Sequence, residues 1–240
     1  MKGRSKLLSK YKKTLKLSSL QRQTLVGLLL GNGCLETQNN GRTYRLLISQ
    51  SEQHALYCDH LYSIFSKWVL TPPQISKRSN GLKRKTFKTI SHSSFRFYGQ
   101  QFYENLALVL QPNAETGLKK RRKKLPKLIH RWLSARSLAY WFMDDGSCKS
   151  ATSFGVVLNT HNFKLCEVQT LCQILTNRWN LQCWPRKQKN KFYKKVYYQI
   201  YISGQSFKQF LKIIEPYLID SMRYKLPSTI FKQNSDNTIA

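Results

Sequence analysis

The sequence predicts an α+β fold built from two similar halves, each running helix, two strands, helix, two strands, helix. Three observations predict this fold. The chain repeats itself in order over four landmarks. Apolar and polar residues alternate as in strands between segments with helical spacing, and small residues in two short motifs allow one helix of each half to pack against the other. With 240 residues, 41% of them hydrophobic, the chain can bury a core in each half.

The internal repeat sets the expected domain boundaries. Its landmarks are LVGLLLGNG (25–33) against LAYWFMDDG (138–146), Trp68 against Trp179, Gly99 against Gly204, and the Lys-Leu-Pro segments that begin at Lys124 and Lys225. Chance similarity rarely preserves order over four landmarks, so we interpret the chain as a tandem duplication of one small domain. We expect a first repeat with a basic N-terminal arm over 1–115, a basic linker over 116–134 and a second repeat over 135–240.

The first half of copy one begins with a basic segment that leads into the motif helix. We place the start of this helix at Ser18 or Ser19, because serine favours helix N-termini. Residues 42–50 alternate as a strand. Residues 51–70 have the pattern of an amphipathic helix that Ser51 can cap and that ends before a Pro-Pro pair.

A hairpin turn at Gly81 is expected to open the second half of copy one. Residues 86–98 alternate again and predict a strand, and residues 99–110 predict the last helix. Copy two follows the same course, with strands around 150–160, 182–186 and 196–203 and helices over 163–180 and 204–218.

The charge of the chain indicates a polyanionic partner. Lys and Arg number 41 against 11 Asp and Glu, which gives a formal net charge of +30. No apolar run approaches the roughly 20 residues that cross a bilayer, so we expect no membrane partner. The N-terminal residues also have the composition of an import peptide, but they continue without a break into the first motif, and we favour a basic arm.

The cysteine and histidine residues do not predict a metal site. Six cysteines show no C-x-x-C pair and no zinc-like spacing, so we expect reduced thiols in an intracellular or organellar compartment. The cluster of His54, Cys58, Asp59 and His60 fits one amphipathic helix better than a set of metal ligands.

Basic and polar residues on the predicted strands and hairpins would form a matched pair of binding surfaces. Lys and Arg can contact phosphates, while Asn, Gln, Ser and Tyr can also contact base edges. The residues that we expect to contact phosphates and base edges are Arg42, Tyr44, Arg45, Gln50, Lys77, Arg78, Lys83, Arg84, Lys85 and Lys88 in copy one, with Lys149, Ser150, Asn159, Arg186, Lys187, Lys189, Lys191, Tyr193, Lys194, Lys195 and Tyr197 in copy two.

The two motifs share one sequence pattern but differ chemically at their eighth residue. Their eighth residues are Asn32 and Asp145, which would lie side by side if the halves pack motif against motif. Two carboxylates at that place, below a phosphate backbone, would suit a divalent metal that needs hard oxygen ligands and open positions. Lys124 and Lys225 could stabilise charge or orient water nearby.

At these residues the chain resembles the LAGLIDADG homing endonucleases, specifically the single-chain, two-repeat group encoded in organellar introns. LAYWFMDDG and the YKLP segment at 224–227 carry the resemblance, which extends from about residue 20 to 230. It implies two pseudo-symmetric αββαββα repeats packed through the motif helices. Each repeat would place an antiparallel, saddle-shaped sheet in the major groove of a long asymmetric double-stranded DNA site, and the protein would hydrolyse both strands and leave short 3′ overhangs.

Carried onto this sequence, the resemblance implies catalytic roles for Asp145, Asn32, Lys124 and Lys225. It implies metal ligation by Asp145, Asn32 and the backbone carbonyls of Gly31 and Asp144. The implied cofactor is Mg²⁺, for which Mn²⁺ or Ca²⁺ can substitute in binding. The chain would act as a monomeric pseudo-dimer, encoded in a chloroplast or a mitochondrion.

Asn32 departs from the family pattern, because its amide carries no net charge and weakens the hold on a hard cation. We therefore expect cleavage to be impaired, abolished or limited to one strand, while DNA binding survives. Three explanations are open: a deliberate Asp-to-Asn change, a natural relative that has become an intron RNA maturase or a nickase, and an enzyme that cuts slowly with one acid. The Asn32-Gly33 pair could also deamidate and regenerate some Asp.

The rival functions are an intron RNA maturase and a nonspecific basic RNA- or ribosome-binding protein.

Overall fold

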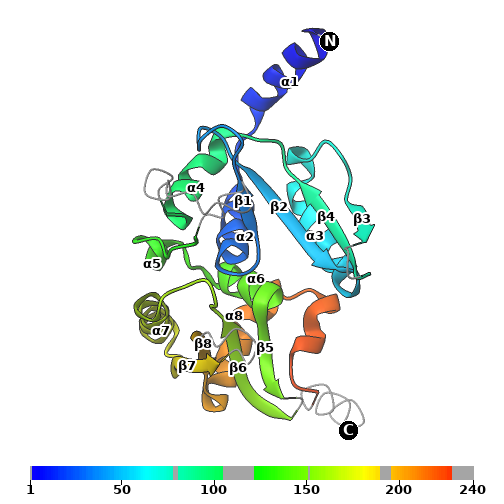
Figure 1. Ribbon diagram of the computed structural model, residues 1–240. Coiled ribbons are helices and arrows are strands. Elements are labelled where there is room, and N and C mark those ends of the chain that lie inside the picture. Colours follow the sequence, from blue (N-terminus) through cyan, green and yellow to red (C-terminus); the bar gives the residue numbers. More distant parts are fainter. Residues whose placement is uncertain (1, 78–80, 105–121, 151, 190–195, 229–240) are drawn as a thin grey trace. The chain divides into compact units, whose positions relative to one another are not determined.

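The computed structural model describes residues 2–77, 81–104, 122–150, 152–189 and 196–228, without the side chains of residues 2–5. The fold is α+β, as predicted, with two four-stranded antiparallel sheets (Figure 1). Helices and strands up to residue 104 are α1 (Lys2–Thr14), α2 (Ser19–Leu30), β1 (Cys34–Glu36), β2 (Arg45–Ser51), α3 (Ala55–Phe65), β3 (Gln74–Lys77), β4 (Lys83–Lys88) and α4 (Arg96–Phe102). Those from residue 122 onward are α5 (Ile129–Trp132), α6 (Ala135–Asp145), β5 (Gly146–Ser150), β6 (Ser153–Asn159), α7 (Leu165–Trp179), β7 (Cys183–Lys189), β8 (Val196–Ile202) and α8 (Phe207–Ile214).

The chain forms two compact units that do not follow the repeat boundary. The first unit contains Met1–Leu25 and Gly33–Arg121, and the second contains Val26–Asn32 and Arg122–Ala240. The second half of α2 and the residues that follow it therefore belong with the second unit. Both motif ends consequently lie in one compact unit.

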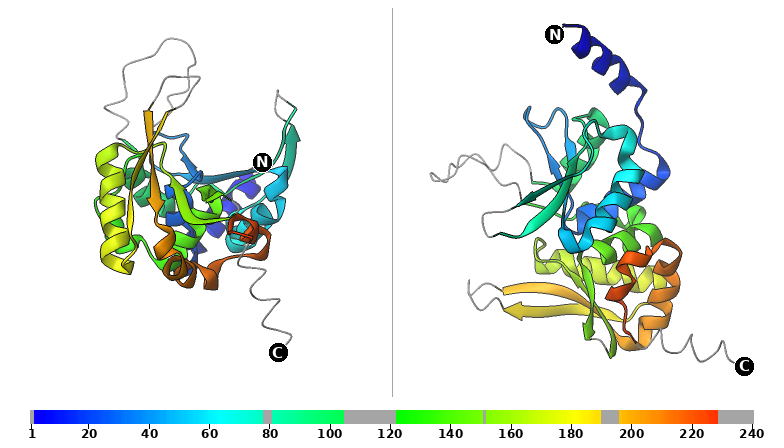
Figure 2. Two further views of the ribbon diagram at one scale, coloured as in Figure 1. Left: turned by 90° about the horizontal axis from the view of Figure 1, so that it is seen from below. Right: turned by 90° about the vertical axis from the view of Figure 1, so that its right-hand side faces the viewer.

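The first unit is built on a sheet with the strand order β1-β2-β4-β3. Alternate residues of β2 are buried, among them Leu46 and Ile48, as period-two patterning predicts for a sheet covered on one face. Helix α3 covers that face (Figure 2) and buries Tyr57, Leu61 and Phe65.

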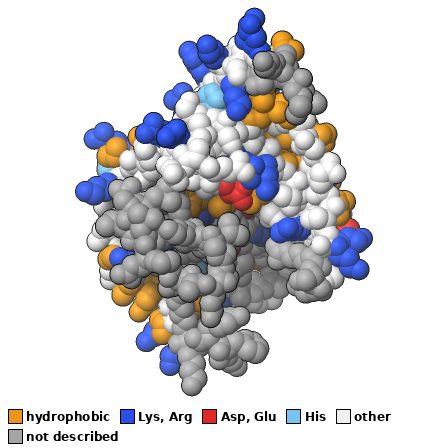
Figure 3. Space-filling view, turned by 45° about the horizontal axis from the view of Figure 1, so that its top comes forward, with side chains coloured by type: hydrophobic (Ala, Val, Ile, Leu, Met, Phe, Trp, Pro, Cys, Tyr) orange, Lys and Arg blue, Asp and Glu red, His pale blue; other side chains and the backbone are white. Residues whose placement is uncertain are grey.

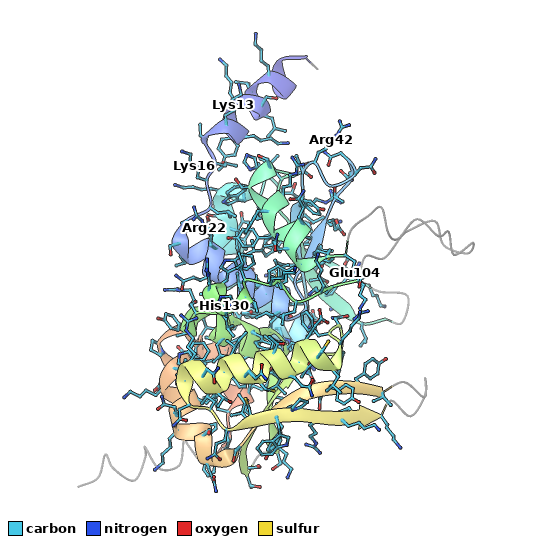
Figure 4. All side chains as sticks on the ribbon, turned by 90° about the vertical axis from the view of Figure 1, so that its left-hand side faces the viewer. Lys13, Lys16, Arg22, Arg42, Glu104 and His130 are labelled. Atoms are coloured by element: carbon cyan, nitrogen blue, oxygen red, sulfur yellow. The ribbon has the colours of Figure 1, made fainter. Side chains whose placement is uncertain are left out.

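Two contacts fix the basic N-terminal helix to the first unit. The hydroxyl of Tyr11 in α1 donates to the carbonyl of Lys67 at 2.5 Å, and the Nε2 of His92 lies 2.9 Å from the carbonyl of Lys12. Lys13 and Lys16, labelled in Figure 4, are exposed. The expected basic arm is thus a helix held at its carboxyl end.

The predicted start of the motif helix is confirmed. Helix α2 begins at Ser19. The Ser18 hydroxyl accepts from the Gln21 N–H at 3.2 Å, and the Gln21 side chain accepts from the Ser18 N–H at 3.0 Å. This reciprocal pair is a capping box, which satisfies two backbone donors at the helix end.

Two predictions about copy one are wrong. Ser51 ends β2 and makes no side-chain cap hydrogen bond, and α3 begins only at Ala55. The strand predicted over 86–98 ends at Lys88, after which the chain becomes helical. Phe95 and Phe102, which are seven residues apart, are fully buried, and this spacing marks one face of a helix. The helix predicted over 99–110 lies outside the described residues from 105 onward.

The second unit repeats this plan with the strand order β5-β6-β8-β7. Helix α7 covers one face of the sheet (Figure 2), with Val168, Leu171 and Leu175 in the core. It ends at Asn180, which adopts a left-handed conformation with φ 52°. The predicted helices and strands of copy two are confirmed. Most of their ends lie within one to three residues of the predicted positions.

One landmark of the repeat is corrected by the structure. Gly99 lies inside α4, whereas Gly204 begins the turn before α8, so they are not equivalent. The equivalent segments are ISHSSF (90–95) and ISGQSF (202–207), each of which leads from the sheet into a helix. Within the described part of the chain, no helix is long and apolar enough to cross a membrane.

Candidate metal and nucleic-acid site

The second half of α2 packs directly on α6 at Gly27. A side-chain Cβ at this glycine would lie 2.8 Å from the Cβ of Tyr140 and would also press against the carbonyl of Ser137. Only glycine permits so close an approach of the two helices. Helix α6 is itself fixed at its start, where the Ser134 hydroxyl accepts from the Ser137 N–H at 3.1 Å. The predicted packing of the motifs through small residues is confirmed at this position.

The carboxyl ends of the two motifs meet beside Asp144. The Oδ2 of Asp144 accepts a hydrogen bond from the backbone N–H of Asn32 at 2.5 Å, and the Asp144 side chain is only 8% exposed. A Cβ on Gly31 would lie 2.5 Å from the same oxygen. The structure therefore brings Gly31, Asn32 and Asp144 together, while the Asn32 side chain stays exposed.

Asp145 is the last residue of α6, and hydrogen-bonding side chains of the second sheet hold its carboxylate. The side-chain amide of Asn159 in β6 donates to Asp145 Oδ1 at 3.3 Å, and Gln199 in β8 donates to Asn159 Oδ1 at 2.5 Å. Burial and then the charge of Asp144 raise the pKa of Asp145 to about 7, although the Asn159 hydrogen bond and two lysines act in the opposite direction. The sequence did not point to Gln199, because its role depends on the pairing of β6 with β8.

Two lysines bind the last carbonyls of the motif helices. Lys123 Nζ donates to the carbonyls of Leu29 at 3.0 Å and Gly31 at 2.6 Å, and its side chain is 9% exposed. In the second motif, Lys225 Nζ lies 2.6 Å from the carbonyl of Met143. Burial lowers the pKa of Lys225, and the charges of Asp144 and Asp145 oppose that shift.

Lys123 therefore occupies the position expected for Lys124. Copy one has one more residue between this lysine and the Leu-Pro pair than copy two has. The insertion was not apparent from the sequence, because the shared Lys-Leu-Pro segment aligns Lys124 with Lys225. A second lysine directly before Lys124 was the one available signal.

The oxygen atoms at the motif ends fit a hard divalent cation. The candidate donors are the Asp145 carboxylate, the side-chain amide of Asn32 and the backbone carbonyls of Gly31 and Asp144, while the Asp144 carboxylate is buried against the Asn32 N–H. Mg²⁺ is bound in proteins through one or two carboxylates together with water and substrate phosphates, which matches this set. Among the described residues, no group of three or more His, Cys, Asp or Glu side chains could hold a metal by itself, so phosphate oxygens would have to complete the shell.

The first sheet separates the predicted DNA-binding residues into two faces. Lys85 contacts Asp59 of α3 at 2.7 Å and so lies on the covered face, and strand alternation places Lys77 and Lys83 there too. Tyr44 and Gln50 are buried at 1% and 9% exposure, so these two predictions are wrong.

The open face of the first sheet keeps Arg45, Arg84 and Lys88 of the predicted set. It adds polar residues that the sequence analysis missed, although strand alternation could have found them. These are Ser49, Gln74, Ser76 and Thr86. Arg42 is exposed on the loop before β2 (Figure 4).

The second sheet divides in the same way. Arg186, Tyr197 and Asn159 lie on the face away from α7, while register places Lys187 and Lys189 on the α7 side. The open face also carries Trp184, Gln188, Gln199 and Tyr201, which were not predicted. Lys149 and Ser150 are exposed at the end of β5. Predicted residues that lie outside the described part are Arg78, Lys191, Tyr193, Lys194 and Lys195.

Positive charge dominates the visible surface. Lys and Arg side chains predominate over acidic ones on the face shown in Figure 3. Several of the acidic residues are already paired, such as Glu36 with Arg45 at 2.9 Å and Glu52 with Lys83 at 3.3 Å. Such a surface favours a polyanion.

Comparison with known proteins agrees with this geometry. The LAGLIDADG DNA endonuclease family matches residues 22–210. A probable intron-encoded endonuclease 1 from Wickerhamomyces canadensis is 31% identical over 92% of this chain and 90% of its own length. The cytochrome b mRNA maturase bI2 of Saccharomyces cerevisiae is 29% identical over 84% of this chain and 46% of its own. The solved structure of the homing endonuclease I-WcaI bound to its DNA recognition sequence superposes with a TM-score of 0.76 at 30% identity, covering 92% of each chain.

Proposed function

Because this chain belongs to the LAGLIDADG DNA endonuclease family, we propose that it is a site-specific, intron-homing endonuclease of double-stranded DNA whose cleavage is limited by Asn32. The observation that carries the proposal is the meeting of the two motif ends at the Asn32–Asp144 hydrogen bond, next to Asp145. The similarity to I-WcaI, which was solved with its DNA, supports duplex DNA as the partner. The similarity to an intron-encoded endonuclease supports an intron-encoded origin, and an organellar intron is part of this proposal.

The residues at the site would have different roles in phosphodiester hydrolysis. Asp145, Asn32 and the backbone carbonyls of Gly31 and Asp144 would hold a divalent cation, with Mg²⁺ as the expected ion, and the bound ion would supply Lewis acidity at the scissile phosphate. Asn159 orients the Asp145 carboxylate through its hydrogen bond. Lys123 and Lys225 add positive charge beside the place where negative charge develops on phosphate.

The open faces of the sheets would bind the duplex. Arg84, Lys88 and Arg186 would contact phosphates or guanine edges, and the neighbouring Ser, Thr and Gln side chains would read bases. Exposed lysines of α1 would add phosphate contacts. The domain boundaries at 115 and 135 and action as a monomer are part of this proposal.

The test begins with the selection of duplex targets by the full-length protein, followed by a Mg²⁺ cleavage assay on the selected site. We expect weak, absent or single-strand cleavage by the chain as it is, and cleavage of both strands by Asn32→Asp. Selection of no duplex, or no cleavage by either form, would contradict the endonuclease assignment.

A second function, that of an intron RNA maturase, is favoured by the similarity to the cytochrome b mRNA maturase. It predicts preferential binding of folded intron RNA over duplex DNA. It also predicts splicing activity that is unchanged by Asp145→Asn. The same Asn32→Asp variant separates the functions, since a maturase gains nothing from it.

A further inference from the structure

The open face of the second sheet carries an aromatic pair among polar and basic side chains. Trp184 of β7 and Tyr201 of β8 are directly opposite each other in the strand register. Their ring centroids lie 5.0 Å apart, with the ring planes inclined by 51°. Trp184 is 48% exposed. Exposed apolar patches and Tyr and Trp side chains are typical of binding surfaces, so this pair indicates a contact with a partner.

Tyr201 is held in place by its packing on β6. A Cβ on Gly155 would lie 2.8 Å from Tyr201 Cζ and would collide with the Tyr201 hydroxyl. The absence of a side chain at position 155 therefore lets the tyrosine ring extend over β6. The Arg186 guanidinium carbon lies 5.9 Å from the centroid of the same ring. The two rings thus form a preformed apolar surface with a cation beside it, and such a surface loses little conformational freedom on binding.

One chemical group in the major groove of DNA matches an apolar surface. Guanine, adenine and cytosine present hydrogen-bond donors and acceptors there, whereas thymine also presents its C5-methyl group. Arg186 and Gln188, which follow Trp184 on the same face of β7, suit the hydrogen-bonding base edges instead. The aromatic pair is therefore complementary to the methyl group of thymine.

We propose that Trp184 and Tyr201 determine sequence specificity by contacting the C5-methyl group of a thymine in the bound duplex. This inference rests on the proposed function, in which the open face of the second sheet lies against double-stranded DNA. Alternate residues of a strand are about 7 Å apart, which is close to the length of two base-pair steps. The thymine should therefore lie about two base pairs from the nucleotide that Arg186 contacts.

The experiment compares thymine with uracil, which lacks only this methyl group and pairs with adenine in the same way. Duplex targets are first selected with the full-length parent and with Trp184→Gln. The parent's site should contain a thymine for which Trp184→Gln has no preference. Replacement of this thymine by uracil should weaken binding by the parent about fourfold, as expected for the loss of one buried methyl group. Binding by Trp184→Gln should not change.

Two control variants separate a base contact from a general effect on binding. Trp184→Phe retains an aromatic surface and should retain the thymine preference. Lys187→Gln changes a residue on the α7 side of the same strand and should select the parent's site. The comparison of thymine with uracil on the parent protein does not depend on the folding of any variant.

Three outcomes would overturn the inference. They are a parent site without such a thymine, equal binding of the thymine and uracil duplexes by the parent, and an unchanged thymine preference in Trp184→Gln. Selection of no duplex would overturn the inference together with the proposed function. Thymine-dependent binding without Mg²⁺ cleavage by the parent or by Asn32→Asp would instead reject the endonuclease function and leave the role of Trp184 standing.

Discussion

Replacement of Lys123 by Met should destabilise the second unit far more than replacement of Lys124 by Met. Lys123 Nζ donates to two carbonyls at the end of α2, those of Leu29 and Gly31, at 3.0 Å and 2.6 Å. Methionine retains most of the apolar stem but leaves both carbonyls without this donor. Because the Lys123 side chain is 9% exposed, water cannot readily replace it.

The magnitude follows from these two contacts. A hydrogen bond to a charged group contributes about 1.5–3 kcal/mol, and relief of the buried charge offsets part of the loss. We expect Lys123→Met to lower the free energy of unfolding by about 2–4 kcal/mol, or the thermal midpoint by roughly 5–15 °C. Lys124 is half-buried and no such contact to the motif carbonyls is seen, so Lys124→Met should cost less than about 0.5 kcal/mol.

Thermal unfolding followed by tryptophan fluorescence checks this prediction, because Trp141 of α6 is fully buried in the same unit. Binding of a selected duplex by Lys124→Met should stay at the parent level. Equal losses for the two variants, or a larger loss for Lys124→Met, would refute the reasoning. Either result would instead assign to Lys124 the role of the basic residue at the first motif.

Two further predictions concern helix packing and DNA binding. Gly27→Ala should lower the thermal midpoint by an amount equivalent to about 1–3 kcal/mol, because its Cβ would crowd Tyr140. Gly204→Ala is the matched control, since its Cβ would lie 3.4 Å from the nearest atom. Arg84→Gln should reduce the slope of log K against log salt for duplex binding by about 1, whereas Lys85→Gln, whose lysine is paired on the α3 face, should leave it unchanged. Equal salt slopes for the two variants would contradict the assignment of the sheet faces.

Features of local backbone chemistry were predictable from the sequence. The serine before α2 forms the expected cap, and Gly81 adopts φ +82° in the turn before β4. Gly27 permits the close approach of helices that its motif indicated. In each case the residue type restricts the backbone directly, so no knowledge of distant contacts was needed.

Features that depend on register or on burial were not predictable in the same way. Phe95 and Phe97 looked like the same face of a strand, but Phe95 is fully buried and Phe97 is 49% exposed because the chain has become helical. Lys85 and Arg84 are both basic and adjacent, so their residue types do not show which one faces α3, and the alternation that places Lys85 on the face of buried Phe87 decides it. The choice of Lys123 over Lys124 depends on a single inserted residue.

The asymmetry of the site is a consequence of the duplication. If two identical copies of the second motif met in this way, an aspartate at each seventh position would face the other, and the space occupied by one carboxylate would be required by both side chains. An interface between identical chains is self-complementary and must place the same residue on both sides. A single chain with two diverged copies escapes this restriction, because Gly31 can be small where Asp144 is large. Asn32→Asp would add a third carboxylate beside Asp144 and Asp145. The gain in Mn²⁺ affinity from this change, measured by titration calorimetry with the selected duplex bound, should be larger when Asp144 is Asn than when it is Asp, because like charges at close range oppose each other.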